Sequence, residues 1–235
     1  MFTVALIGPD GAGKTTVARR IEQELAAPVA YVYMGVSPDS SNRLLPTTRL
    51  VRLVKRSLGA PPDTAGPPDP GRLAEKPAGS RLARLGRGAR STLRLVNLVA
   101  EEWYRQLLAW SYLRRGSIVV FDRHFFSDYY AYDIAGKGPR QLSRRIHGLL
   151  LDKVYPKPDL VIYLDAPGEV LLERKGEGTV ELLERRRADY LAVGRLAGEF
   201  VVVDASRPID VVTDDVVAAI RGFGRTRGDC GTDGA

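Results

Sequence analysis

The chain contains 235 residues with a formal net charge of +7, and 44% of its residues are hydrophobic. This length suits one α/β domain with an insertion, and no apolar run approaches the ~20 residues of a membrane span. The single cysteine, Cys230, excludes an internal disulfide framework, so we expect a reducing, cytoplasmic setting.

The first expected element is an apolar strand at 2–7, which runs directly into the sequence GPDGAGKTT at 8–16. This is a complete G-x-x-x-x-G-K-T phosphate-binding loop, and residues 15–26 after it have the apolar spacing of a helix. Backbone N–H groups of such a loop point at a polyphosphate, Lys14 reaches the β- and γ-phosphates, and the Thr15 hydroxyl is placed to ligate Mg²⁺. We therefore expect a nucleoside triphosphate, ATP, to contact Gly8, Asp10, Gly11, Ala12, Gly13, Lys14, Thr15 and Thr16.

A second expected strand at 29–34 precedes a basic, Pro- and Gly-rich insertion at about 36–90. Between residues 43 and 100, twelve basic residues face three acidic ones, so this segment carries +9 and leaves about −2 elsewhere. Its last arginines fall three or four apart, a spacing that suits contact with a nucleic-acid backbone: Arg81, Arg84, Arg87, Arg90 and Arg94. Residues 43–93 lack aromatic side chains for base stacking, so a nucleic-acid partner stays open but is not favoured.

A helix is expected at 91–114 and a strand at 117–121, which ends in Asp122-Arg123-His124. A carboxylate at the end of the strand beside a phosphate loop is placed to hold Mg²⁺, and Arg123 can hold a second phosphate. Five aromatic residues follow within 125–132. They predict either core packing or a pocket in which a base stacks, with Ser127 or Asp128 at its edge.

The rest of the chain predicts helices at 139–153, 167–174, 179–194 and 208–222, with strands at 159–164 and 200–203. Arg174 precedes a glycine-flanked break, which suits a mobile lid whose cations close over a transferring phosphoryl group; Arg185, Arg186 and Arg187 are the alternative. The turn at 203–208 is placed to pack against the nucleotide base through Ala205 and Arg207. Apolar strands alternating with helices predict a three-layer α/β/α fold with a five-stranded parallel sheet, as a single domain over 1–222 with a flexible tail at 223–235.

Together these motifs resemble the thymidylate kinase family of nucleoside monophosphate kinases, over residues 1–35 and about 95–222. The resemblance implies a P-loop kinase fold and transfer of the ATP γ-phosphoryl group to an acceptor monophosphate. It implies that Asp10 binds the acceptor sugar, Arg123 the acceptor phosphate, and Asp122 the Mg²⁺ or its water. Lys14 and Arg174 would complete the catalytic set, Ser127 and Asp128 would contact the acceptor base, and a homodimer would form through helices such as 91–114.

Two features depart from the family pattern. Residues 33–38 read YMGVSP where the family carries Glu-Pro-Gly or a similar motif, and the nearest counterparts of its base-contacting helix residues are Glu101, Glu102, Trp103 and Arg105. The acceptor therefore stays open between dTMP, a related or modified nucleotide and a non-nucleotide small molecule. A nucleic-acid-stimulated P-loop ATPase or binding module is the alternative to a kinase.

Overall fold

The structure of the chain is a computed structural model that describes residues 1–35, 81–130, 142–176 and 178–228, with the single positions 45, 48, 53 and 57. Within these ranges, the side chains of residues 81–91, 94 and 128 are not described. Most of the predicted insertion, including its Pro- and Gly-rich run, therefore lies outside the described residues. The same holds for the end of the predicted tail, at 229–235.

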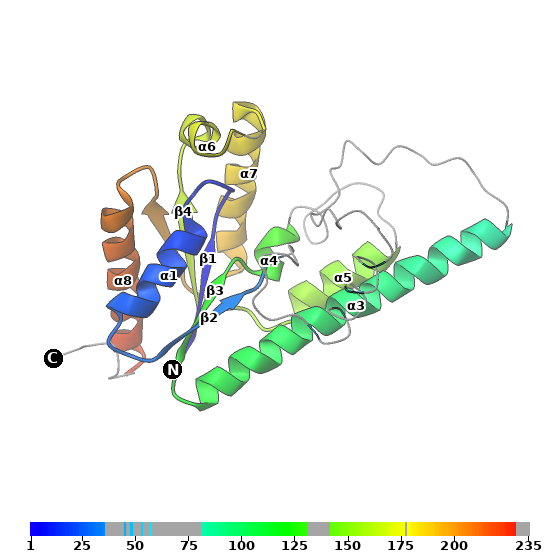
Figure 1. Ribbon diagram of the computed structural model, residues 1–235, viewed down its shortest axis with the longest axis horizontal. Helices are drawn as coiled ribbons and strands as arrows, with labels where there is room; N and C mark the ends of the chain where they lie inside the picture. Colours follow the sequence, from blue (N-terminus) through cyan, green and yellow to red (C-terminus); the bar gives the residue numbers. More distant parts are fainter. Residues whose placement is uncertain are drawn as a thin grey trace.

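Five parallel strands form one sheet in the order β2-β3-β1-β4-β5 (Figure 1). Each is an apolar run whose residues are buried or half-buried along most of its length, as expected for a parallel sheet covered on both faces. The predicted five-stranded α/β fold is confirmed. The strands are β1 (Thr3–Ile7), β2 (Val29–Tyr33), β3 (Ile118–Asp122), β4 (Leu160–Asp165) and β5 (Phe200–Asp204).

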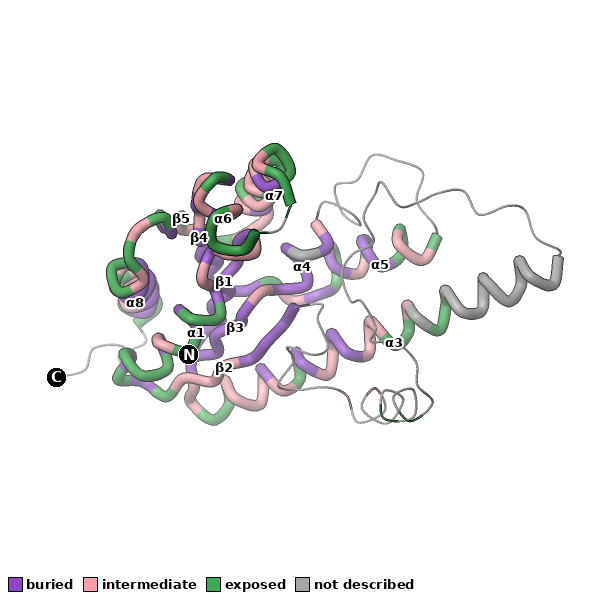
Figure 2. Tube along the Cα trace, turned by 45° about the horizontal axis from the view of Figure 1, so that its top comes forward, coloured by how far each residue is buried: buried purple, intermediate pink, exposed green. Residues whose placement is uncertain are grey.

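Helices cover both faces of this sheet, and the buried residues concentrate between the layers (Figure 2). Alternate residues of β1 enter two cores: Val4 and Leu6 pack with α1 and α8, and Ala5 and Ile7 pack with α3, α5 and α7. Among the described residues, no helix has the length and apolar character of a membrane span. The helices are α1 (Lys14–Glu24), α3 (Arg81–Arg114), α4 (Phe125–Asp128), α5 (Leu142–Lys153), α6 (Gly168–Lys175), α7 (Val180–Val193), the 3₁₀ turn η3 (Gly194–Leu196) and α8 (Ile209–Thr226).

Two predicted helix boundaries are wrong. Helix α3 begins at Arg81 instead of residue 91, because a helix that is already nucleated extends through Gly86 and Gly88 at a modest cost of roughly 1 kcal/mol each. Helix α8 continues to Thr226 instead of ending at 222, so the predicted tail begins later. Phe223 packs edge-to-face on Phe2 with ring centroids 5.0 Å apart, and this contact holds the last turn of α8.

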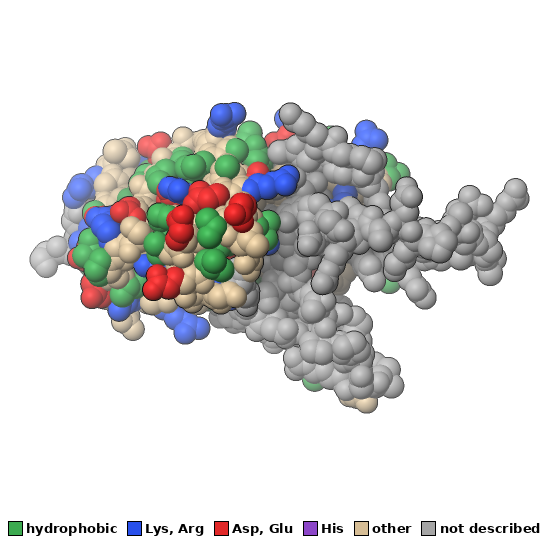
Figure 3. Space-filling model, turned by 90° about the horizontal axis from the view of Figure 1, so that it is seen from above, with side chains coloured by type: hydrophobic (Ala, Val, Ile, Leu, Met, Phe, Trp, Pro, Cys, Tyr) green, Lys and Arg blue, Asp and Glu red, His purple; other side chains and the backbone are tan. Residues whose placement is uncertain are grey.

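The carboxyl ends of the parallel strands meet at one edge of the sheet, where ligands bind in folds of this kind. The phosphate loop follows β1, Arg123 and His124 follow β3, and Ala205 follows β5. Helix α6 and the beginning of α7, which form the predicted lid, lie beyond this same edge, and the rest of α7 runs down beside the sheet (Figure 1). Seen from that end, acidic and basic side chains are interspersed over the described part of the surface (Figure 3).

Candidate active site

The phosphate-binding loop has the backbone geometry that its glycines allow. Gly13 is the N-cap of α1 with φ 85°, and Gly8 has φ 149°. A Cβ atom on Gly8 would lie 2.7 Å from the backbone oxygen of Leu164, so the loop packs directly on β4. Side chains other than hydrogen are therefore disfavoured at these two positions, and the loop leads directly into the N-terminus of α1, which favours an anion.

Lys14 lies inside the loop, where the sequence predicted it. Its ammonium group donates to the backbone oxygens of Gly8 at 2.8 Å and Pro9 at 2.6 Å, and it lies 3.9 Å from an Asp10 carboxylate oxygen. The side chain is buried. A positive charge held at this place can exchange loop carbonyls for phosphate oxygens. Thr16 is exposed beside it and, with Thr15, Arg19, Arg20 and Gln23, lines a cavity of about 220 Å³ along α1.

Asp122 joins the loop to the neighbouring strands. One of its oxygens accepts hydrogen bonds from the Thr15 hydroxyl at 2.6 Å and from the Tyr31 hydroxyl at 2.8 Å. Burial and the Asp122 charge raise the pKa of Tyr31, so its proton stays on the phenol and is donated to the carboxylate. The other oxygen, Oδ1, is buried without a hydrogen-bond partner. A hydroxyl and a carboxylate with an unpaired oxygen fit the protein side of a Mg²⁺ site shared with phosphates.

Arg123 has φ 68°, and it is the one described residue other than glycine with a positive φ. A long side chain in the left-handed region stores backbone strain, a condition that concentrates at functional sites. Its backbone N–H donates to the Leu6 oxygen at 3.0 Å, and its guanidinium group forms an ion pair with Asp10 of the phosphate loop. The strained backbone thus directs a cation to the loop.

Asp10 lies among three cations. Burial alone raises the pKa of its carboxyl group, but the charges of Lys14, Arg123 and Lys175 outweigh burial and lower the pKa below its usual range. Lys175 comes from the last turn of α6, and a Cβ atom on Gly11 would lie 3.6 Å from the Cβ of Lys175. The lid therefore brings a lysine to the loop.

The predicted lid residue Arg174 points elsewhere. Its guanidinium group donates to the backbone oxygens of Ala205 at 2.8 Å and Ser206 at 3.1 Å, which ties α6 to the turn after β5. Arg187 pairs with Asp165 at the end of β4 through two hydrogen bonds of 2.6 and 2.7 Å. Both arginines hold the lid on the strand ends.

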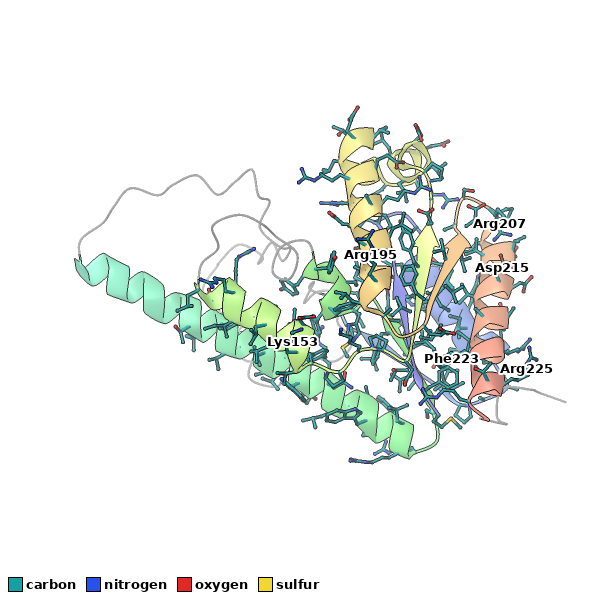
Figure 4. All side chains as sticks on the ribbon, turned by 180° about the vertical axis from the view of Figure 1, so that it is seen from behind. Lys153, Arg195, Arg207, Asp215, Phe223 and Arg225 are labelled. Carbon is teal, nitrogen blue, oxygen red and sulfur yellow. The ribbon has the colours of Figure 1, made fainter. Side chains whose placement is uncertain are left out.

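The turn after β5 contains the predicted base-contacting residues. Ala205 is buried and Arg207 is partly exposed. Figure 4 shows Arg207 beside Asp215 of α8, with which it forms an ion pair, and it also lies 3.6 Å from Asp204. Arg207 is thus held at the surface of this turn.

Part of the aromatic segment after β3 packs in the hydrophobic core, which is the first of the two interpretations of its sequence. Phe125, Phe126 and Tyr129 are buried in the cluster that includes α3 and α5, and Tyr132 lies outside the described residues. The hydroxyl of Ser127 donates to the His124 backbone oxygen at 2.8 Å, and the side chain of Asp128 is not described. Core packing therefore accounts for these three rings, and a base-stacking role for other aromatic residues of the segment stays a prediction.

Arg105 is brought to the end of β2 instead of projecting into an open cleft. It is 3% exposed and donates to the backbone oxygens of Gly35 at 2.9 Å and Tyr33 at 3.4 Å. Tyr31 was not selected from the sequence, whereas Lys175 belongs with Arg174 to the predicted lid segment. Tyr31 belongs to an ordinary strand pattern, whereas the four-residue spacing of Glu101 and Arg105 was a signal for their pairing.

A glycine-rich phosphate loop between the central strand of a parallel sheet and its first helix defines the class of P-loop nucleotide-binding α/β proteins. The thymidylate kinase family model matches residues 66–216, which is more than half of the sequence. The chain belongs to the thymidylate kinase family.

Curated relatives support this assignment. A protein of Archaeoglobus fulgidus named "Probable thymidylate kinase" is 37% identical over 118 residues, covering 47% of this chain and 57% of the relative. Thymidylate kinases of Shewanella amazonensis and Alteromonas mediterranea are 33% and 34% identical, over 46% and 47% of this chain and 55% and 53% of their own lengths. The chain thus spans little more than half the length of the curated relatives it matches.

Proposed function

We propose that this protein is a nucleoside monophosphate kinase, which transfers the γ-phosphoryl group of ATP to dTMP or a related acceptor. The observation that carries this proposal is the pairing of Arg123 with Asp10 of the phosphate loop. It puts a second cation beside the site of Lys14, as transfer between two phosphate-bearing substrates requires. Membership of the thymidylate kinase family supports the same reaction.

On the donor side, the loop residues Gly8–Thr16 bind the ATP phosphates, and Lys14 reaches between the β- and γ-phosphates. Thr15 and Asp122 hold Mg²⁺, which when bound neutralises charge on the phosphates. Tyr31 fixes the Asp122 carboxylate by donating to Oδ2 and so leaves Oδ1 available. Ala205 and Arg207, in the turn after β5, contact the base.

On the acceptor side, Arg123 holds the monophosphate and Asp10 the sugar, with Ser127 and Asp128 toward the base. A monophosphate is anionic near neutral pH, so its oxygen attacks without a strong general base. Rate enhancement then comes from positioning and charge neutralisation. Lys175 of the lid supplies a cation near the loop, and Arg174 can add a second one only after it leaves the backbone oxygens of the turn after β5.

A second copy of the chain is the proposed partner, and the single cysteine supports a cytoplasmic location. Helix α3 exposes an apolar stripe at Leu93, Val96 and Leu107, whose exposed fractions are 71, 59 and 57%. These positions fall on one side of a helix. An exposed apolar helix face of this kind is typical of a subunit interface.

The test is ADP release from MgATP against a panel of nucleoside monophosphates, nucleosides and sugar phosphates, with DNA and RNA as a separate arm. We expect turnover with at least one monophosphate, and a Lys14→Ala variant with the same fold should lose it. Turnover stimulated only by nucleic acid would contradict the kinase proposal and favour an ATPase.

A further inference from the structure

Arg105 is one of the most deeply buried cations of the described chain. Its guanidinium group lies against the Phe125 ring, 5.2 Å from the centroid, and bonds to the two backbone oxygens at the end of β2. Burial lowers the pKa of Arg105, and the nearby charge of Glu101 acts in the opposite direction. The cation is thus retained by contacts inside the protein.

Glu101 connects this cation to a second point of the backbone. One of its oxygens lies 3.6 Å from the Arg105 guanidinium, and both oxygens accept from the backbone N–H of Leu45, at 3.1 and 3.2 Å. Gly35 and Leu45 are therefore both bonded to a single turn of α3. The buried pair fixes the backbone where the chain leaves β2.

Gly35 in turn supports Arg123. A Cβ atom on Gly35 would lie 2.5 Å from the Cδ of Arg123 and 2.5 Å from the Tyr33 hydroxyl oxygen. The Arg123 side chain therefore passes directly over the Gly35 backbone on its way to Asp10. A shift of this backbone by a few tenths of an ångström moves the guanidinium group of Arg123.

We propose that Arg105 is a positioning residue for the acceptor phosphate site, acting through the Gly35 backbone on Arg123. This inference rests on the proposed kinase function. Arginine suits the role because its planar fork bonds two carbonyls while its face packs on an aromatic ring. This positioning role replaces the expected direct contact of Arg105 with the acceptor, because the guanidinium group of Arg105 is already bonded to the backbone.

The test compares Arg105→Lys with wild type, with dTMP as the acceptor. Lysine keeps the charge but loses the fork, so the KM for dTMP should rise about tenfold while kcat and the KM for MgATP change less than about threefold. Gly35→Ala should produce the same pattern. The matched control is Arg114→Lys, at the exposed end of the same helix, which should leave both KM values unchanged.

A double-variant cycle separates positioning from general destabilisation. In an Arg123→Ala background, Arg105→Lys should change kcat/KM for dTMP by less than about twofold, because the residue that it positions is gone. Independent, multiplying effects of the two variants would overturn the inference. A lower kcat with an unchanged KM for dTMP would also overturn it. That pattern arises when part of the protein is unfolded and the folded part still binds dTMP normally.

If the wild-type chain phosphorylates no monophosphate, the proposed function fails, and a ligand-free measurement still decides the inference. The urea midpoint of the double variant Arg105→Lys/Arg123→Ala should then shift by less than the sum of the two single shifts, because both substitutions disrupt the same connected set of contacts. Additive shifts would overturn the inference by themselves.

Discussion

Asp122 is fully buried and has an uneven environment: two hydroxyl groups donate to one of its oxygens and none to the other. A buried carboxylate that keeps an oxygen without a partner costs stability, so its retention points to a ligand. At the residue scale the site is therefore organised around two acidic residues. Asp122 accepts from Thr15 of the phosphate loop, and Asp10 lies among the cations Lys14, Arg123 and Lys175.

Asp122→Asn should lower kcat by about 10²-fold, because an amide keeps the volume but not the charge that orients the cation of MgATP. We expect the Mg²⁺ concentration for half-maximal rate to rise as well. Steady-state rates over a Mg²⁺ series measure both. The exposed Asp214→Asn is the matched control, and an unchanged Mg²⁺ dependence in Asp122→Asn would count against the metal role.

Arg123 permits a test of backbone strain. At φ 68° glycine is unstrained and alanine is not, so Arg123→Gly should be more stable than Arg123→Ala by roughly 1 kcal/mol. Both variants lose the side chain, and both should lose acceptor kcat/KM about equally. Urea unfolding gives the stability difference; an alanine variant of equal or higher stability would contradict the strain.

At the scale of elements, the lid helices are attached to the strand ends by arginines. Helix α6 is bound to the turn after β5 through Arg174, and α7 is bound to β4 through Arg187 and Asp165. Glu184 extends the second contact, since it accepts from the backbone N–H of Gly168 at 2.6 Å and pairs with Arg187 at 3.3 Å. These polar contacts hold α6 and α7 against the strand ends.

Arg187→Lys should reduce the free energy of unfolding by roughly 1 kcal/mol near neutral pH, since lysine cannot form both bonds to Asp165. Burial raises the pKa of Asp165, but its bonds with Arg187 and Tyr163 lower it below the usual 3.8. The contribution of the pair is thus complete above about pH 3.8 and is lost as the pH falls through the lowered value.

Urea unfolding of wild type and Arg187→Lys from pH 7 to pH 3 measures this dependence. The difference in free energy of unfolding between wild type and variant should be constant near neutral pH and shrink below about pH 3.8. Exposed Arg186→Lys, one residue away, is the control and should show no difference. A stability difference that grows as the pH falls would contradict the contribution assigned to the Arg187–Asp165 pair.

In the molecule as a whole, one sheet edge collects the site from segments far apart in sequence, and the long helix α3 ends at the opposite edge, just before β3, and extends outward beside the sheet (Figure 1). Helix α3 has two sides with different roles. Its inner side carries Glu101 and Arg105 to the end of β2, and its outer side exposes the apolar stripe proposed as the subunit interface. The proposed subunit interface and the proposed positioning of the acceptor site thus involve the same helix.

Val96→Glu combined with Leu107→Glu should convert the proposed dimer into monomers, because two buried charges per subunit oppose association. Light scattering after gel filtration gives the mass. Leu191→Glu on α7, where 44% of the leucine is exposed, is the control and should remain dimeric. A wild-type mass of one chain would contradict the proposed interface.

Much of the fold could be predicted because its signals are local. Apolar runs marked the five strands, and the spacing of glycines, Lys14 and Thr15 marked the phosphate loop. The four-residue helix α4 has no periodicity to detect, and the end of α8 depends on a contact between Phe223 and Phe2. The role of Arg105 depends on how α3 packs on β2, which no local pattern contains.

Phosphoryl transfer to a monophosphate is tested most directly by following the γ-phosphoryl group itself. Wild-type protein is incubated with MgATP labelled in the γ-phosphate and with dTMP, and the label is traced by chromatography. We expect the label in a nucleoside diphosphate, as the terminal phosphate of dTDP or of the product of a related acceptor from the panel. Label found only in inorganic phosphate would contradict it, because the chain would then hydrolyse ATP without transferring its phosphoryl group.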